Sequence, residues 1–383
     1  MEELPPEPPD PAEPWPPPRQ WPAPDLPAWV LVLLIPATLF AYLVVQGSLQ
    51  LLSIGLALWF TEVFVFFALP WLLARFREER PADAMRARWP GWKPVGWGAA
   101  LGVANLFGAV VPLQYLAQHL FPRSLVELFD MGHLFERQDM RDLALLMAAV
   151  AVAAPVCEEA FFRGFLQERL SRVMGNPWRV AVLVAAVFSA FHLDPVGFLA
   201  RFELGLLFGL LYWKMGSLWP GVAAHAANNI TSTALFLVAR SHGNEDADPE
   251  LRELLMLSAA GLTLFFVLLR FALRARVPPA PPPQRVPLTP GALWPWPIAA
   301  LLSIGLTLAT DLRGVQLNLI DAKVEMPSEH RDADEHEEQL RDELFQVRSK
   351  ARRGQTTLEE YETRRKEAAE LLRLREPASP VDE

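Results

Sequence analysis

The chain has 383 residues, of which 52% are hydrophobic and 21% are charged, with a formal net charge of −9. The charge is concentrated in a few blocks, which leaves several stretches of about 18 residues or more almost uncharged, long enough to cross a roughly 30 Å hydrocarbon core as helices. The only cysteine, Cys157, excludes an intramolecular disulfide. These features predict an all-α fold, a polytopic bundle of about 8–9 transmembrane helices with a soluble helical C-terminal tail.

The N-terminal segment, residues 1–27, contains twelve prolines. Proline fixes φ and lacks an N–H, so we expect this segment to be extended and disordered. It has no basic n-region and no usual cleavage site, and we expect no removable signal peptide. Candidate spans follow at about 28–46, 49–74, 95–118, 143–170, 177–193, 198–214, 218–239, 252–272 and 294–312.

The fifth and sixth candidate spans are short and meet at the sequence HLDPVG, so they could form an interrupted pair. Basic residues cluster at 75–93, 163–179 and 270–285. If all candidate spans cross, these clusters lie on one side, which the positive-inside rule makes cytoplasmic. We therefore expect a multi-pass protein of a bacterial inner membrane with a cytoplasmic N-terminus. The side on which the tail lies depends on the number of spans.

The sequence beyond the spans is polar. Its end reads as two amphipathic helices around RRGQTT, with Thr357 as N-cap and Glu360 completing a capping box. This hairpin resembles the short SHOCT-type oligomerisation modules, and a solvated tail without a partner is an equal alternative. The whole pattern predicts a disordered N-terminus (1–27), N-terminal transmembrane helices (28–142), a central core (143–240), C-terminal transmembrane helices (241–312) with a proline-rich linker (278–290), and a charged helical tail (322–383).

The sequence PVCEEAFFRGF places two glutamates inside an apolar run. Glu159 and Arg163 are four residues apart on one helix face, so they can pair. Glu158 points about 100° away from that face and has no partner on its own helix. A buried carboxylate without a partner suits a group that accepts and returns a proton. The alternative is a helix end that reaches water.

Two further polar groups interrupt the spans. His192 ends an apolar helix one turn after Phe188, and HAANN places His225 and Asn229 on one face of the next long span. Taken singly, His192 could be an interfacial residue, and His225 with Asn229 could join helices. Taken with the glutamates, they form the parts of a hydrolytic centre. A carboxylate and one histidine activate water, directly or through a metal, while the other histidine and the amide hold an oxyanion.

Three motifs in order, EEAFFR, FSAFH and HAANN, resemble those of the CPBP intramembrane proteases, which include CAAX prenyl endopeptidases and bacteriocin-processing or immunity proteins. The connecting LGLLFGLLYWKMGSLWPGVAAHAANN is similar to the same family, and the resemblance covers roughly 143–240. The HExxH pattern of zincins and the GxSxG nucleophile elbow are absent from the sequence. The resemblance implies these roles: general base (Glu158), water activation (His192), support of the geometry (Glu159, Arg163), oxyanion binding (His225, Asn229) and lining of the site (Phe188).

The expected function is therefore an intramembrane endopeptidase acting on a membrane-associated peptide or protein. Glu158, His192 and His225 could supply three ligands of an open Zn²⁺ site, which the sequence does not distinguish from a metal-free glutamate mechanism. Bacteria lack farnesylated substrates, so CAAX processing is not carried over. Expected partners are membrane lipids, the substrate and a second copy bound through the hairpin, with no nucleic acid. The alternatives are a non-proteolytic immunity or scaffold protein acting through its tail and, with less support, a proton-relay transporter.

Overall fold

The computed structural model describes residues 26–129, 146–241, 250–274, 286–289, 291, 293–327 and 335–373. The expected disordered N-terminus and most of the proline-rich linker lie outside these residues. Within the described part the elements are helices, with no β-strand. The chain divides into two compact units, one formed by Met1–Ala41, Glu62–Arg137 and Met147–Leu293, the other by Tyr42–Thr61, Gln138–Leu146 and Trp294–Glu383.

Five of the described helices are long and apolar enough to cross a membrane: Ala28–Gln50, Ile54–Phe76, Trp92–Leu120, Trp219–Ala239 and Leu251–Ala272. They match five of the expected spans, and the chain is an all-α, multi-pass membrane protein.

Two expected spans need correction. The helix α12 (Pro177–Ala190) has 14 residues, which is about 21 Å and too short to cross the hydrocarbon core. A full crossing at 177–193 is therefore wrong, and the interrupted pair with α13 (Phe198–Met215) describes this region better. The last expected span ends too early, because α16 (Pro295–Lys323) continues past residue 312 into the predicted tail.

Three long helices contain a π-helical segment that a proline follows. The pairs are η1 (Glu62–Phe67) with Pro70, η2 (Leu106–Val110) with Pro112, and η3 (Ala149–Ala153) with Pro155. A proline donates no N–H, and its ring crowds the carbonyl four residues earlier, which in each case lies inside the π segment. Proline thus accompanies three of the described π segments, whereas η4 has no proline after it in its helix and Pro36 lies within the regular helix α1.

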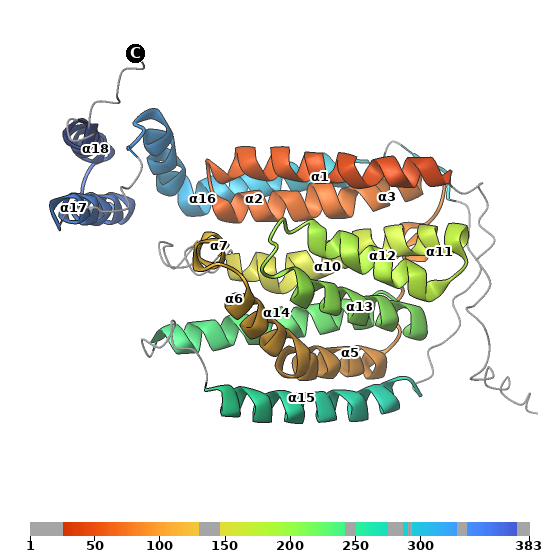
Figure 1. Cartoon of the computed structure of the whole chain (residues 1–383). Coiled ribbons are helices and arrows are strands. Elements are labelled where there is room, and N and C mark those ends of the chain that lie inside the picture. The colour runs from red at the N-terminus through yellow and green to blue at the C-terminus, as the bar shows by residue number, and fades with distance from the viewer. Residues whose placement is uncertain are drawn as a thin grey trace, which may run out of the picture. The chain divides into compact units, whose positions relative to one another are not determined.

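The core of the first unit is built around α14 (Trp219–Ser241), the helix that carries His225. α14 packs along α5 (Trp92–Asn105), and α15 (Leu251–Ala272) also packs on α5, so that α5 lies between the other two in Figure 1. α13 and α10 (Ala154–Glu159) pack on α14 as well. This arrangement brings the EEAFFR motif against the helix that carries HAANN, while the FSAFH motif lies on α12, which packs on α13.

The contact between α5 and α14 depends on two glycines four residues apart. A Cβ atom at Gly98 would lie 2.1 Å from the Pro220 carbonyl oxygen, and one at Gly102 would lie 2.2 Å from that of Ala224. Neither position has room for a side chain. Small residues at this spacing let two membrane helices approach backbone to backbone.

In the second unit, the C-terminal hairpin packs on the end of α16. Its helices, α17 (Glu335–Arg352) and α18 (Leu358–Arg373), form a common apolar core with Leu317 of α16. Asp321 of α16 accepts hydrogen bonds from both helices, through Arg348 and Tyr361. The hairpin is therefore packed on its own chain, and its binding to a second copy stays a prediction.

The start of α18 has the predicted cap. The Glu360 N–H donates to the Thr357 hydroxyl oxygen at 3.0 Å, which confirms Thr357 as N-cap. The Glu360 carboxylate accepts from the hydroxyl group of Thr356 instead of returning to the Thr357 N–H. Only one half of the expected capping box is formed in the described hairpin.

Candidate active site

The Glu-Glu pair ends a short regular helix between two π-helical segments. α10 (Ala154–Glu159) follows η3 and leads into η4 (Ala160–Gln167), which carries Arg163. π-Helical segments change the direction of side chains within a helix and are frequent at functional sites. The pair therefore lies within a continuous helix rather than at a helix end in water.

Glu159 and Arg163 form the expected ion pair. Arg163 Nη1 lies 2.6 Å from Glu159 Oε1, with both side chains 0% exposed. Arg163 Nη2 donates to the Gly205 carbonyl of α13 at 3.1 Å. The guanidinium carbon also lies 4.5 Å from the ring centroid of Phe188. A carboxylate, a carbonyl and an aromatic face thus replace water around this buried cation.

His225 lies between the two glutamates. Its Nδ1 is 3.3 Å from Glu159 Oε1, and its Nε2 is 4.0 Å from Glu158 Oε2. The ring stacks on Phe208, with centroids 4.8 Å apart. Glu158 is 12% exposed at its side chain and its Oε2 has no hydrogen-bond partner in the described residues. Glu159 Oε2 is likewise without a hydrogen bond among the described residues, but only Glu158 has a partly exposed side chain.

His192 has a defined tautomer. Its Nδ1 lies 3.0 Å from the Phe188 carbonyl oxygen, and a carbonyl only accepts, so Nδ1 carries the hydrogen and Nε2 presents its lone pair. The Phe188 ring lies edge-on to both histidines, 5.2 Å from His192 and 6.0 Å from His225 between centroids. His192 is exposed, which leaves this side of the site accessible to a substrate.

Asn229 makes a contact that the sequence did not predict. Its Nδ2 donates to the Val150 carbonyl of η3 at 2.9 Å, and its Oδ1 accepts from Asn228 at 3.3 Å. Asn229 therefore joins α14 to the helix of the Glu-Glu pair. One of its two amide hydrogens is bound in this way, and its expected oxyanion role remains a prediction.

Two charged residues near the site were missed in the sequence. Arg201 Nη1 lies 2.7 Å from Asp194 Oδ2, and the charge of Arg201 acts on both Glu158 and His192. Asp194 also accepts the N–H groups of Val196 and Gly197. The signal was the turn sequence HLDPVG, in which an aspartate before proline binds the backbone that follows.

A third residue, Glu62, was also missed in the sequence. Like Glu158, it is an ionisable residue inside an apolar run. It lies inside the apolar run FTEVFVFF, on a candidate span, and is buried. An ionisable side chain in such a run marks a candidate functional site.

The described residues do not fit the expected zinc site. Within them, no three His, Cys, Asp or Glu side chains lie close enough together to hold a metal ion. The set Glu158, His192 and His225 is therefore not assigned as a ligand set, and no chemical step below passes through a metal.

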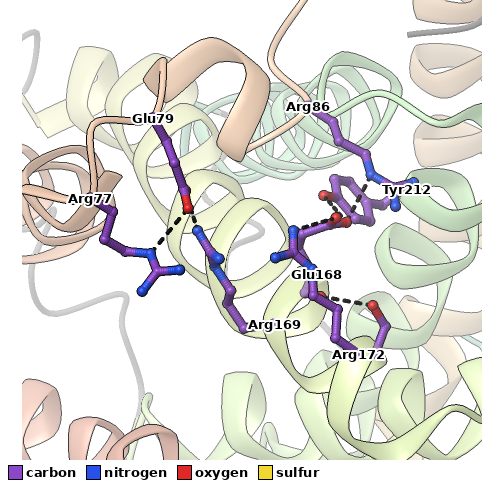
Figure 2. A network of polar contacts seen from close by, with 8 residues as sticks. Arg77, Glu79, Arg86, Glu168, Arg169, Arg172 and Tyr212 are labelled. Atoms are coloured by element: carbon purple, nitrogen blue, oxygen red, sulfur yellow. Dashed lines mark hydrogen bonds and ion pairs between the residues drawn. The ribbon is translucent and has the colours of Figure 1, made fainter. Parts of the chain in front are cut away.

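Two clusters of charge hold the helix that follows the Glu-Glu pair (Figure 2). In the first, Glu168 binds Arg86 at 2.7 Å, Arg172 at 3.2 Å and the hydroxyl of Tyr212 at 3.1 Å. Burial by itself lowers the pKa of the Arg86 guanidinium, but the Glu168 carboxylate more than offsets burial, so the pKa is raised. Arg86 therefore stays charged in spite of its burial.

In the second cluster, Glu79 lies between Arg77 and Arg169 in Figure 2. Both clusters connect α11 (Glu168–Met174) to the segment after α3. Met85 of the same segment packs against Gly164, where a Cβ atom would lie 2.8 Å from the Met85 Cβ. These contacts fix the helix that carries the Glu-Glu pair from its C-terminal side.

The part of the chain that carries these motifs is similar to a known protein family. Residues 140–231 match the family described as type II CAAX prenyl endopeptidase Rce1-like. This segment is Rce1-like. It contains every motif residue discussed above, from Glu158 to Asn229, and does not reach the C-terminal hairpin, whose SHOCT resemblance is unsupported.

One curated relative is also similar. YyaK of Bacillus subtilis (strain 168), itself described as uncharacterized, is 27% identical over 187 residues. The match covers 45% of this chain and 59% of YyaK, so the chain spans less than two thirds of that protein. No solved structure matches the chain.

Proposed function

We propose that this protein is an intramembrane endopeptidase that hydrolyses a peptide bond of a membrane-associated peptide or protein. The observation that carries the proposal is the position of His225 between Glu159 and Glu158, at 3.3 and 4.0 Å. The Rce1-like match over the same residues supports it. If Glu158 had a structural role alone, we would expect its Oε2 to be hydrogen-bonded, whereas it has no partner among the described residues.

In the proposed reaction, Glu158 takes a proton from a water molecule as the water oxygen attacks the peptide carbonyl carbon. The lone pair of His192 Nε2 accepts a hydrogen bond from this water and orients it. The resulting oxyanion is held by the second amide hydrogen of Asn229 and by Nε2 of His225, which must carry a hydrogen for this role because the Nδ1 hydrogen faces Glu159. Glu158 then passes its proton to the amide nitrogen as the C–N bond breaks, which yields a carboxylic acid and an amine and returns Glu158 to its carboxylate form. General base catalysis of this kind contributes roughly 10²–10⁴-fold, and an oxyanion donor about 10²–10³-fold.

Glu159 and Arg163 do not touch the reacting atoms in this scheme. Arg163 neutralises Glu159, and Glu159 in turn holds Nδ1 of His225. They are therefore positioning residues. We propose a metal-free mechanism, because the water can be activated by side chains alone, and we expect 1,10-phenanthroline to leave the activity unchanged.

The basic residues clustered at 75–93, 163–179 and 270–285, apart from the buried Arg163, support the proposal that the protein lies in a bacterial inner membrane with these segments and the N-terminus on the cytoplasmic side, α12 and α13 together returning to the side on which they begin. An accessibility assay with single cysteines in a Cys157→Ser background tests this orientation.

The test of function begins with the substrate. Membrane proteomes of a wild-type strain and a Glu158→Ala strain are compared for precursors that accumulate uncleaved. A synthetic peptide spanning the processed site is then incubated with the full-length protein in nanodiscs. Glu158→Gln and His225→Ala are expected to lose at least about 100-fold in kcat.

The control variant is Glu253→Gln, on the exposed first turn of α15, which is expected to retain full activity. Equal cleavage by wild type, Glu158→Gln and His225→Ala contradicts the proposal. A phenotype that survives Glu158→Ala but is lost on deletion of 335–373 would instead favour a scaffold acting through the hairpin.

A further inference from the structure

Glu62 is a buried carboxyl group that the reaction above does not use. It is the first residue of η1, inside the span Ile54–Phe76, and it is 5% exposed. Its Oε2 has no hydrogen-bond partner, and no described Lys, Arg or His forms an ion pair with it. An ionisable group in a membrane span is costly, and its retention points to a use.

The face of η1 that carries Glu62 is turned toward the Glu-Glu pair. η1 packs directly on α10, which ends in the pair. Phe66, one turn after Glu62, contacts Phe161 and Phe162 of η4 at 5.7 and 5.9 Å between ring centroids. Glu62 and Glu158 are close enough to interact electrostatically, and Cys157 interacts with both. A second carboxyl group, that of Glu62, thus lies within electrostatic range of Glu158, on the helix that packs against its own.

The two carboxyl groups differ in their surroundings. Glu158 has Nε2 of His225 at 4.0 Å and interacts with the charges of Arg163 and Arg201. Glu62 has no such cation among the described residues. Two ionised carboxylates side by side in an apolar interior repel each other and lack solvation, and one proton between them removes both costs. Glu62, which has no compensating charge, is the group that retains this proton.

We propose that Glu62 is a positioning residue of the site, whose neutral carboxyl group donates a hydrogen bond to Glu158, directly or through one water molecule. The bond fixes one oxygen of the general base and turns the other toward the attacking water. The positioning role of Glu62 rests on the proposed function. The hydrogen bond between Glu62 and Glu158 does not depend on whether the protein cleaves peptides.

Carbodiimide labelling tests, without a substrate, whether Glu62 holds the proton that this hydrogen bond requires. Dicyclohexylcarbodiimide is an apolar reagent that couples to protonated carboxyl groups, and mass spectrometry locates the modified residue. At neutral pH, the full-length protein in nanodiscs is expected to be labelled at Glu62, in wild type and in Glu158→Gln alike. Label at Glu158 without label at Glu62, or no label at either residue, overturns the proposal.

Kinetics test the positioning role on the peptide identified above. Glu62→Gln keeps an N–H donor and is expected to stay within about 3-fold of wild-type kcat, while Glu62→Leu loses about 10- to 100-fold in kcat with little change in KM. The matched control is Glu203, a carboxyl group in α13 whose Oε2 already accepts from Asn105 at 2.7 Å. Glu203→Gln and Glu203→Leu are expected to retain kcat per folded molecule, measured on monodisperse protein.

Wild-type kcat in Glu62→Leu, or an equal loss in Glu62→Gln and Glu62→Leu, overturns the positioning role. If wild type and Glu158→Ala cleave the peptide equally, the proposed function fails, and the labelling result alone decides whether Glu62 is neutral.

Discussion

Glu159 and Arg163 form an ion pair from which water is excluded on both sides, with Nη1 and Oε1 2.6 Å apart and both side chains 0% exposed. The pair fixes α10 to η4 and, through the Gly205 carbonyl, to α13. A buried charge that loses its partner is far more costly than an exposed one.

Arg163→Met should therefore lower the free energy of unfolding by about 3–5 kcal/mol, because it leaves an uncompensated carboxylate at Glu159. The double variant Arg163→Met/Glu159→Gln should be more stable than Arg163→Met, because it removes that charge as well. Thermal unfolding in detergent measures both. A double variant that is less stable than Arg163→Met by the full cost of Glu159→Gln would show that the two residues are not coupled.

Gly102→Ala should separate α5 from α14, since the added Cβ atom would lie 2.2 Å from the Ala224 carbonyl oxygen. Because α14 carries His225, we expect lower thermal stability and lost activity together. Gly96→Ala is the matched control on the same helix, where nothing lies within 4 Å of the added atom. Equal effects of the two substitutions would contradict the close packing.

Glu168→Leu should leave Arg86 and Arg172 buried without their shared carboxylate (Figure 2). The expected loss of stability is about 3–5 kcal/mol, as for other broken buried pairs. Glu367→Leu provides the comparison, because Glu367 forms an exposed pair with Arg364, worth about 0–1 kcal/mol. The two variants are compared by thermal unfolding and by yield of folded protein.

Thr357→Ala should remove the N-cap of α18 and destabilise its first turn by about 1 kcal/mol. Hydrogen exchange of residues 358–361 should become faster, while exchange in α17 changes less. Thr363→Ala is the control, because the Thr363 hydroxyl donates to a carbonyl within the helix. Unchanged exchange at the start of α18 would show that the cap does not stabilise it.

Hydrogen bonds from Lys323 and Lys366 lower the pKa of Glu362 to about 2, from an ordinary value of 4.5. A carboxylate with a lowered folded-state pKa stabilises the fold above its ordinary pKa, and this contribution is lost as the pH falls through 4.5 toward 2. Glu362→Gln should therefore exchange faster than wild type in α18 at pH 6, with the difference vanishing near pH 2. A difference that grows on acidification would contradict the assignment.

The sequence by itself determined the all-α class of the fold, because apolar runs and prolines affect helices through residues that are close in the chain. The runs predicted five of the membrane helices, and a proline follows three of the described π segments. The i,i+4 spacing also predicted the pairing of Glu159 with Arg163. The order of the three motifs identified Glu158, His192 and His225 as one set of candidate site residues.

Contacts between residues distant in the chain were decided by tertiary structure, because their geometry depends on how helices cross. The two glycines of α5 bring α14 close, and His225 then lies between two glutamates more than 60 residues earlier in the chain. Helix packing also bound Asn229 to Val150 and placed η1, which carries Glu62, against α10. The local spacing of residues showed which side chains have the chemistry of a catalytic site. The way in which the helices cross decided which of these side chains lie close together.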